Sequence, residues 1–350
     1  MTLLKGAMIG FGTAAASFHL PGWKMRNDFE ICAVVDPVQD RLEMAEREIP
    51  GIKTYHTVDE LFEWEDLDFI DICTPPALHG ESVIKACQSG IHILCEKPLI
   101  TSLEEYREAK QLTLKKGVTL FTIHSWKYAP LFLKIEEILK EGKLGEVFYA
   151  ELNTFRSEPS RIVGEGENWR FSPSIAGGGI MMDHGWHSLY LLCSIIGQRP
   201  HAISARMRRL KYLNVSVEDT MSCFLDFPSA IGEIHLTWAA GGRSNQGVIF
   251  GKEGSISLEH DRIVVQRRSE EPQLFSFSES LSAKSSFPQW FSRLLSDFRE
   301  EILDPEVRGT NLKEAELCLL LTQLAYQSNA EGSRLIAVPQ TIGTEVGSSI

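Results

Sequence analysis

The stretch GAMIGFGTAAA, residues 6–16, decides the fold of the N-terminal half of this chain. It holds the pattern Gly10-x-Gly12-x-x-Ala15 between an apolar run typical of a strand and the start of a helix. Gly10 allows a tight turn, Gly12 lets the backbone approach a diphosphate, and the small Ala15 permits close packing of helix on strand. The helix N-terminus favours negative charge through its N–H groups and its dipole. The stretch therefore predicts a dinucleotide site with contacts from Gly10, Phe11, Gly12, Thr13, Ala14 and Ala15.

An acidic residue, Asp36, ends the second expected strand, residues 30–36. A carboxylate at this place accepts hydrogen bonds from the adenosine ribose and repels a 2′-phosphate. Asp36 therefore favours NAD as the cofactor, while Arg41, which follows shortly after, leaves NADP possible.

Short apolar runs alternate with helix-length amphipathic segments as far as about residue 123. The apolar runs are continuous, which indicates strands buried on both faces of a parallel sheet. Strand and helix in repeated alternation predict a doubly wound Rossmann domain over residues 1–125. The expected strands are residues 5–10, 30–36, 69–74, 92–96 and 119–124, and the expected helices are residues 41–47, 79–89 and 103–116.

The pattern changes after about residue 126, where a helix over residues 130–141 is followed by alternating strands. Alternation predicts a large, mostly antiparallel sheet with one face on helices and the other face available. We therefore expect an α/β protein: an N-terminal Rossmann domain, and an α+β domain over residues 126–340 for substrate binding and oligomerisation. The tail, residues 341–350, is polar and expected to fray. The expected strands are residues 147–155, 201–209, 220–227, 230–238, 247–251 and 262–268, and a helix over residues 312–331 closes the core.

The composition excludes several classes of protein. Of 350 residues, 43% are hydrophobic and 23% charged, which is typical of a globular chain, and the formal net charge is −12. A basic face for nucleic acid or anionic lipid is lacking, and no apolar run is long enough to cross a membrane. The seven cysteines form no CxxC pair and no zinc spacing, so we expect free thiols and no metal site. The first strand begins almost at the N-terminus, which predicts no signal peptide and a cytoplasmic location.

Four further motifs accompany the glycine pattern: TPPALH (residues 74–79), CEKP (residues 95–98), NWRF (residues 168–171) and AGGGIMMDHGWH (residues 176–187). Together they make the chain resemble the Gfo/Idh/MocA oxidoreductases, the family of glucose–fructose oxidoreductase and inositol dehydrogenase. The resemblance runs from Lys5 to about Val338. It implies NAD(P)-dependent dehydrogenase activity on a polyhydroxylated small molecule.

The resemblance also implies roles for individual residues. Thr74, Pro75 and His79 would line the cofactor at the carboxyl edge of the sheet, where doubly wound folds bind ligands. Glu96 and Lys97 follow the next strand, and in the family the lysine reaches the nicotinamide and the substrate hydroxyl, with a Lys–Pro bond that is usually cis. Lys127, Trp169 and Arg170 would hold the nicotinamide end or the substrate.

Asp183 and His187 are four residues apart in an expected helix, which places them on one face. Spacing alone fits a buried structural histidine as well as a catalytic one, but the family motif favours catalysis. His187 would then take the substrate's hydroxyl proton, Lys97 would stabilise the developing alkoxide, and Asp183 would orient His187 or bind a hydroxyl.

Two residues depart from the family pattern. Lys127 occupies a position that is usually arginine, and Tyr190 replaces the aspartate of an HxxD motif. Lysine does not grip a carboxylate or phosphate bidentately, so the substrate cannot be carried over from the family. His124 and Trp126, near the domain junction, fit sugar contact and junction packing equally well.

Three hypotheses remain open at this stage. The first is a dehydrogenase acting on a sugar, a cyclitol or a derivative. The second is a lyase or glycosidase that uses NAD transiently, with no net NADH formed, and the third is a non-catalytic sensor of NAD and a sugar. The available sheet face and the family both predict a homodimer or homotetramer.

Overall fold

The computed structural model describes residues 2–160, 168–283 and 287–340. They divide into two units, and each is described by itself. The first unit comprises residues 1–128 and 285–315, and the second comprises residues 129–284 and 316–350. The expected boundary after residue 125 is close to the observed one. The assignment of residues 285–315 to the second unit is wrong, because they pack into the first. The expected frayed tail lies outside the described residues.

The first unit contains a six-stranded sheet in the order β3-β2-β1-β4-β5-β6, with every neighbouring pair parallel. This order confirms the doubly wound prediction. All four residues of β4 are buried, as expected for a strand covered on both faces. The strands are β1 (Leu4–Ile9), β2 (Phe29–Val35), β3 (Lys53–Tyr55), β4 (Phe69–Ile72), β5 (His92–Cys95) and β6 (Leu120–Thr122).

The helices of this unit begin and end at recognisable signals. Thr57 and Glu60 form a capping box at the start of α3, and Gly90, with φ of +77°, ends α4. The α-helices are α1 (Leu20–Trp23), α2 (Gln39–Glu48), α3 (Val58–Trp64), α4 (His79–Ser89), α5 (Leu103–Lys116) and α9 (Pro288–Leu303). The π- and 3₁₀-helical turns are η1 (Ala15–His19), η2 (Pro76–Leu78) and η3 (Ser125–Tyr128).

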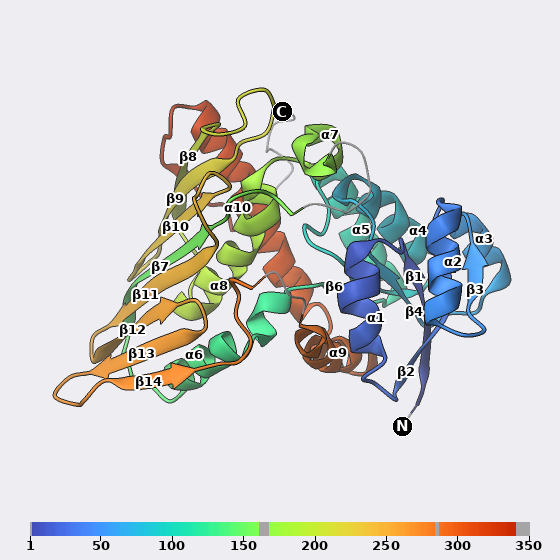
Figure 1. Cartoon of the computed structure of the whole chain (residues 1–350), viewed down its shortest axis with the longest axis horizontal. Coiled ribbons are helices and arrows are strands. Elements are labelled where there is room, and N and C mark those ends of the chain that lie inside the picture. The colour runs from blue at the N-terminus through green and yellow to red at the C-terminus, as the bar shows by residue number, and fades with distance from the viewer. Residues whose placement is uncertain (1, 161–167, 284–286, 341–350) are drawn as a thin grey trace. The chain divides into compact units, whose positions relative to one another are not determined.

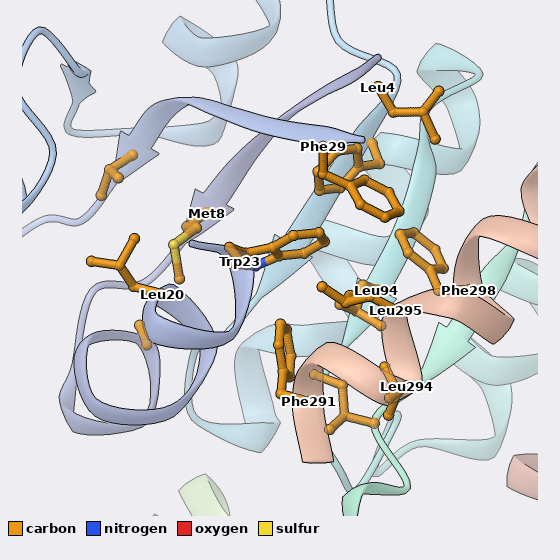
Figure 2. Packing of buried hydrophobic residues seen from close by; sticks show 14 of the residues in the cluster. Leu4, Met8, Leu20, Trp23, Phe29, Leu94, Phe291, Leu294, Leu295 and Phe298 are labelled. Atoms are coloured by element: carbon orange, nitrogen blue, oxygen red, sulfur yellow. The ribbon is translucent and has the colours of Figure 1, made fainter. Parts of the chain in front are cut away.

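An aromatic core explains why α9 belongs to the first unit. Phe291 and Phe298 of α9 are fully buried and contact residues from the start of the chain. Phe291 lies edge-on to Trp23 at 5.4 Å, and Phe298 stacks on Phe29 at 6.2 Å between ring centroids. Figure 2 shows these side chains converging with Leu294 and Leu295 of the same helix. An amphipathic helix must cover its apolar stripe, and here the strands and α1 cover it.

The second unit contains a nine-stranded sheet in the order β14-β13-β12-β11-β7-β10-β9-β8-β15. Among the described strands of this nine-stranded sheet, only β7 and β10 pair in parallel, which confirms the mostly antiparallel prediction. Buried and exposed residues alternate along β8, β9 and β10. The strands are β7 (Val147–Phe155), β8 (Ala202–Arg208), β9 (Thr220–Asp226), β10 (Ile231–Thr237), β11 (Ser244–Gly251), β12 (Gly254–Glu259), β13 (Arg262–Arg267), β14 (Gln273–Ser276) and β15 (Ile336–Ala337).

One face of this sheet packs on helices. A side chain at Gly232 of β10 would meet Leu192 of α8 at 2.6 Å, so helix and strand are in close contact. Figure 1 shows α8 and α10 along this face, and no helix among the described residues along the other. The helices and turns are α6 (Pro130–Lys140), η4 (Trp169–Phe171), α7 (Pro173–Ala176), η5 (Met181–Gly185), α8 (Trp186–Ile196) and α10 (Thr310–Ala330), the last of which begins in the first unit.

Candidate functional site

The glycine turn follows β1 and opens the helical segment that contains η1. Gly10 has φ of +86°, which favours glycine, and a side chain there would lie 3.1 Å from the backbone nitrogen of Thr74. At Gly12 the position of a side chain is open, with no described atom within 4 Å. The backbone at Gly12 is therefore accessible to a diphosphate, as the dinucleotide motif requires.

The residues around Gly12 differ in what they can offer a ligand. Phe11 and Ala15 are fully buried and form part of the core, so only their backbone is available. Thr13 and Ala14 are exposed at the start of the helical segment, where the first N–H groups lack partners within the helix. These N–H groups suit an anionic diphosphate.

Asp36 follows β2 and is 1% exposed. Its oxygens accept hydrogen bonds from the N–H groups of Phe11 at 2.8 Å and Val38 at 2.9 Å. The Arg41 guanidinium lies 3.5 Å from the same carboxylate. Arg41 thus offsets the negative charge that repels a 2′-phosphate, so the surroundings of Asp36 fit NAD and leave NADP open.

The segment after β4 carries Thr74, Pro75 and His79. The hydroxyl of Thr74 is buried beside the glycine turn and has no hydrogen-bond partner among the described residues. A buried hydroxyl is normally hydrogen-bonded, so this one points to a partner outside the chain, such as a ligand. Pro75 is half-buried next to it. Together with Gly10, Gly12 and Asp36, these features fit a dinucleotide.

The His79 ring is fully buried, and burial lowers its pKa. Its Nδ1 lies 2.9 Å from the carbonyl oxygen of Pro98, and its Nε2 lies 2.8 Å from that of Thr74. His79 therefore links the segments after β4 and β5. This placement favours an indirect role at the cofactor site over the direct contact expected from the sequence.

Glu96 and Lys97 follow β5, and the Lys97–Pro98 bond is cis, as expected. One carboxylate oxygen of Glu96 accepts the Lys97 N–H at 2.9 Å, and the other lies 3.0 Å from Nε2 of His19. Lys97 itself is half-buried. The segment that presents Lys97 is thus held through the carboxylate that precedes it.

Lys127 lies in η3, and its Nζ contacts the two carboxylate oxygens of Glu314 at 2.7 and 3.0 Å. The buried His124 ring approaches the same carboxylate at 3.3 Å. Burial alone would raise the pKa of Glu314, but the hydrogen bond from His124 and the charge of Lys127 lower it to about 2. Glu314 was not predicted, because 187 residues separate it from Lys127.

Asp183 lies in η5, which is a π-helical turn rather than the α-helix expected from its spacing. Single π-turns of this kind are frequent at functional sites. The Asp183 carboxylate is near two basic side chains, with Nδ1 of His184 at 3.1 Å and Nε of Arg170 at 3.7 Å. Arg170 in turn stacks on Trp169, at 4.4 Å from the ring centroid.

His187 lies in the first turn of α8 and is 7% exposed. Its Nδ1 lies 2.7 Å from the hydroxyl of Tyr190. The residue that departs from the family motif is therefore the partner that orients the candidate catalytic histidine. A phenol donates or accepts one hydrogen bond, but unlike a carboxylate it does not provide a full negative charge.

A half-buried carboxylate that the sequence did not reveal, Glu218, holds the glycine segment that leads into η5. It accepts hydrogen bonds from the N–H groups of Gly179 and Met181, each at 3.0 Å, and from the Tyr326 hydroxyl at 2.8 Å. A side chain at Gly179 would lie 1.9 Å from the carbonyl oxygen of Glu218. The glycine is thus needed for close approach to Glu218. No local pattern in the sequence predicts these contacts, because Glu218 lies 37 residues from Met181 and 108 residues from Tyr326.

Lys97 belongs to the first unit, and Asp183 and His187 belong to the second. Within the first unit the structure brings together the glycine turn, Asp36 and Thr74. Within the second it brings Asp183 beside Arg170, and His187 beside Tyr190.

These features fit a dinucleotide-binding protein, and comparison with known families gives its class. Residues 4–124 match the model of the oxidoreductase family with an NAD-binding Rossmann fold. Residues 132–257 match the Gfo/Idh/MocA C-terminal domain. The chain belongs to the Gfo/Idh/MocA oxidoreductase family.

Curated relatives match part of the chain. An uncharacterised oxidoreductase of Schizosaccharomyces pombe is 30% identical over 239 residues, which cover 67% of this chain and 63% of that protein. The scyllo-inositol 2-dehydrogenase (NADP(+)) of Bacillus subtilis is 25% identical, with 65% and 63% covered. The chain thus matches somewhat less than two thirds of the length of these relatives.

Solved structures match nearly the whole chain and share its fold. A levoglucosan dehydrogenase in complex with NADH and L-sorbose superposes with a TM-score of 0.84 at 20% identity, covering 96% of this chain and 99% of that one. An aldose-aldose oxidoreductase from Caulobacter crescentus complexed with glycerol gives 0.80 at 22% identity, with 96% and 99% covered. Among the described helices of the present chain, none combines the length and the hydropathy that crossing a membrane requires.

Proposed function

We propose that this protein is an NAD(P)-dependent dehydrogenase that transfers a hydride between the nicotinamide and a carbinol carbon of a sugar, a cyclitol or a derivative. The observation that carries the proposal is in the first unit: an open glycine turn with Asp36 and a Thr74 hydroxyl that has no hydrogen-bond partner among the described residues, in a unit that also presents Lys97. The names of two relatives, a scyllo-inositol dehydrogenase and a levoglucosan dehydrogenase, support a polyhydroxylated substrate.

Different residues of the chain move the proton and stabilise the developing charge. Bound NAD supplies the hydride acceptor. His187 takes the hydroxyl proton of the substrate, and we assign the transfer to Nε2 because Tyr190 engages Nδ1. Lys97 stabilises the negative charge that develops on the substrate oxygen.

Further residues bind rather than react. Asp183 accepts a hydrogen bond from a substrate hydroxyl, and the neighbouring Arg170 and His184 side chains orient its carboxylate. Thr74 and Pro75 contact the cofactor, while Lys127, Trp169 and Arg170 hold the nicotinamide end or the substrate. A carboxylate, a guanidinium and imidazoles together offer the donors and acceptors that a ring with several hydroxyls needs.

The test is a panel of sugars, inositols and their phosphates with NAD and with NADP, followed by the absorbance of NADH. We expect net reduction of the cofactor with at least one compound. Lys97→Met should lower kcat/KM by about 10²-fold or more, because alkoxide stabilisation is lost. The control Lys115→Met, at the exposed end of α5, should stay within twofold of wild type.

Other results of this panel would reject the proposal. Substrate turnover with retained cofactor and no net NADH would indicate a lyase or glycosidase with transient redox. Binding of NAD and a sugar without turnover would indicate a sensor.

The face of the large sheet turned away from α8 supports self-association. Three apolar side chains on it, Ile231, Phe250 and Val264, are 37–40% exposed. Exposed apolar patches of this kind are typical of protein interfaces. We infer a homodimer or homotetramer built through this face. Light scattering at micromolar concentration should give at least twice the chain mass, and a monomeric mass would contradict the inference.

We also infer a cytoplasmic location. All seven cysteines are free thiols, four of them buried, which suits a reducing compartment. Cell fractionation should recover the protein with cytosolic markers, and recovery with secreted or membrane proteins would contradict this.

A further inference from the structure

His19, at the end of η1, has no exposed surface and lies between two carboxylates. Its Nδ1 is 2.9 and 3.0 Å from the two oxygens of Asp71 in β4. On the opposite side, its Nε2 is 3.0 Å from Glu96, directly after β5. One ring therefore joins the helical segment of the glycine turn to two neighbouring strands.

The geometry favours the protonated form of this ring. A neutral imidazole has one donor and one acceptor nitrogen, so with two carboxylates one oxygen would face a lone pair. The Cys73 thiol, 3.0 Å from Nδ1, could donate to that nitrogen, but the Asp71 oxygens would then face the same lone pair. An imidazolium satisfies both carboxylates, and the thiol then donates to Asp71 at 3.6 Å.

The charges around the ring agree with this assignment. Burial alone would lower the pKa of His19, but the charge of Asp71 raises it well above its usual value. Burial alone would raise the pKa of Glu96, but the hydrogen bond from His19 lowers it. Burial also raises the pKa of the Cys73 thiol to about 12, which keeps it neutral.

A metal ion is the alternative occupant of this cluster, since His19, Asp71 and Cys73 bring their ligand atoms within 4.8 Å of one another. Ligands around a tetrahedral zinc ion lie about 3.3 Å or more apart, given bonds of about 2.0–2.3 Å. The contacts of 2.9 and 3.0 Å between Nδ1 and its neighbours are shorter than this and fit hydrogen bonds.

The other contacts of the cluster show what the imidazolium holds. The Trp23 indole N–H donates to Asp71 at 2.7 Å. Trp23 is anchored in the aromatic core (Figure 2) and stacks on Phe69 there. Glu96, on the other side of the ring, accepts the backbone N–H of Lys97. Hydrogen bonds therefore connect the core, through Asp71 and His19, with the segment that presents the lysine.

We propose that His19, as a buried imidazolium between Asp71 and Glu96, is a positioning residue for Lys97 and ties it to the helix of the dinucleotide turn. The proposal rests on the function proposed above, because it assigns Lys97 a part in turnover. A displacement of about 1 Å at a reacting group lowers turnover by about 10²-fold, so loss of His19 should have a large effect without any contact to substrate.

A double-mutant cycle tests whether His19 acts through the lysine. His19→Gln should lower kcat by about 10²-fold, and adding it to Lys97→Met should lower kcat no further. The matched control is His92→Gln at the other end of β5, where Nδ1 accepts only a backbone N–H from Thr119; it should stay within about threefold of wild type. Multiplicative loss in the double variant would overturn the proposal, since it would show a general structural effect.

A second readout needs no substrate and separates this proposal from the proposed function. Competitive acetylation across a range of pH, read by mass spectrometry, reports the titration and access of the Lys97 amine. His19→Gln should shift the Lys97 profile, and His92→Gln should not. An unchanged profile in His19→Gln overturns the positioning role. If instead Lys97→Met keeps full turnover while His19→Gln still shifts the Lys97 profile of the otherwise wild-type protein, the assignment of Lys97 to alkoxide stabilisation fails and the positioning of Lys97 by His19 stands.

Glu96→Gln serves as the second variant if His19→Gln does not fold. It removes one of the two negative charges at the ring but keeps an amide of the same shape. It should shift the Lys97 profile in the same direction by a smaller amount, and a wild-type profile would overturn the proposal.

Discussion

Two π-helical turns in this protein share a backbone conformation but differ in the surroundings of their charged side chains. Each follows a glycine segment and leads into an α-helix: Ala15–His19 precedes α1, and Met181–Gly185 precedes α8. In the first, a basic ring lies between two carboxylates and has no exposed surface. In the second, the Asp183 carboxylate lies near two basic side chains and keeps 14% of its surface exposed.

The difference teaches which turn holds structure and which can meet a ligand. His19 and Asp71 have no exposed surface, and this pair resists change because separating the two charges leaves one of them unpaired in the interior. A carboxylate that keeps exposed surface can still accept a hydrogen bond from a substrate. We therefore assign positioning to the first turn and binding to the second.

The largest effect that would sharpen this comparison is on turnover. His187→Gln removes the proposed base and should lower kcat by about 10²–10⁴-fold, the usual contribution of a general base. His184→Gln, from the same segment but assigned only to orient Asp183, should cost at most about tenfold. Steady-state kinetics with the substrate found in the panel would measure both. Equal losses in the two variants would contradict the assignment of His187.

The next largest effect is expected on stability, through the packing beside the second π-helical turn. Gly179→Ala places a methyl group 1.9 Å from the Glu218 carbonyl oxygen. The backbone must move to relieve this clash. We expect a loss of about 3 kcal/mol in the free energy of unfolding. The control Gly242→Ala, where a side chain would meet no described atom within 4 Å, should change it by less than about 0.5 kcal/mol. Denaturant melts would give both values, and a stable Gly179→Ala would show that the close approach is not required.

The buried cluster of the first turn predicts a distinctive pH dependence. The pKa of His19 is raised in the fold, so its contribution to stability is complete below its unfolded value of about 6.5 and is lost as the pH rises through the raised pKa. The pKa of Glu96 is lowered, so its contribution is complete above about 4.3 and is lost as the pH falls through the lowered value. Between these limits His19→Gln should destabilise the protein by about 3 kcal/mol, as expected for a broken buried ion pair.

Unfolding curves of wild type and His19→Gln at a series of pH values would measure this difference. The difference in free energy of unfolding between the two proteins should be largest from about pH 4.5 to 6.5 and should become smaller above that range. A difference in free energy of unfolding that grows with rising pH would show that the His19 ring is neutral in the folded protein.

The smallest effect concerns Tyr190. Tyr190→Phe removes the hydroxyl that meets Nδ1 of His187 and leaves the packing of α8 in place. One hydrogen bond contributes about 1 kcal/mol, so kcat should fall about three- to tenfold and its pH profile should shift. Tyr190→Asp, which restores the family residue, should shift the profile toward higher pH, because a carboxylate raises the pKa of a nearby imidazole. An unchanged profile in both variants would show that Tyr190 does not orient His187.

Much of the fold could be predicted from local pattern. Gly10 and Gly12 placed the dinucleotide turn, and continuous or alternating apolar runs distinguished the parallel sheet from the antiparallel one. The hairpin strand β12 was missed, since a short run between turns, with serine at alternate positions, gives a weak signal. The segment containing α9 was assigned to the wrong unit, because an amphipathic helix shows that it has an apolar face but not which core covers it.

The candidate site was predicted in part. The motifs named Lys97, Asp183 and His187, and their roles stay predictions that the variants above will test. Glu96 was named beside Lys97, but its contact with His19, 77 residues away, was not predicted. Asp71, 52 residues from His19, and Glu218, 108 residues from Tyr326, were not predicted at all. Contacts over such separations leave no periodic trace in a single sequence.

The sequence by itself determined the class of fold, the family and the residue types available for chemistry. These follow from short-range rules, since glycine conformation, strand periodicity and motif spacing act within a few residues. Only the tertiary structure decided that His19 is a charged ring between two carboxylates, that Tyr190 engages His187, and that Gly179 needs to be small. The physical reason is that burial and charge pairing depend on which distant segments meet, and those determine protonation and orientation.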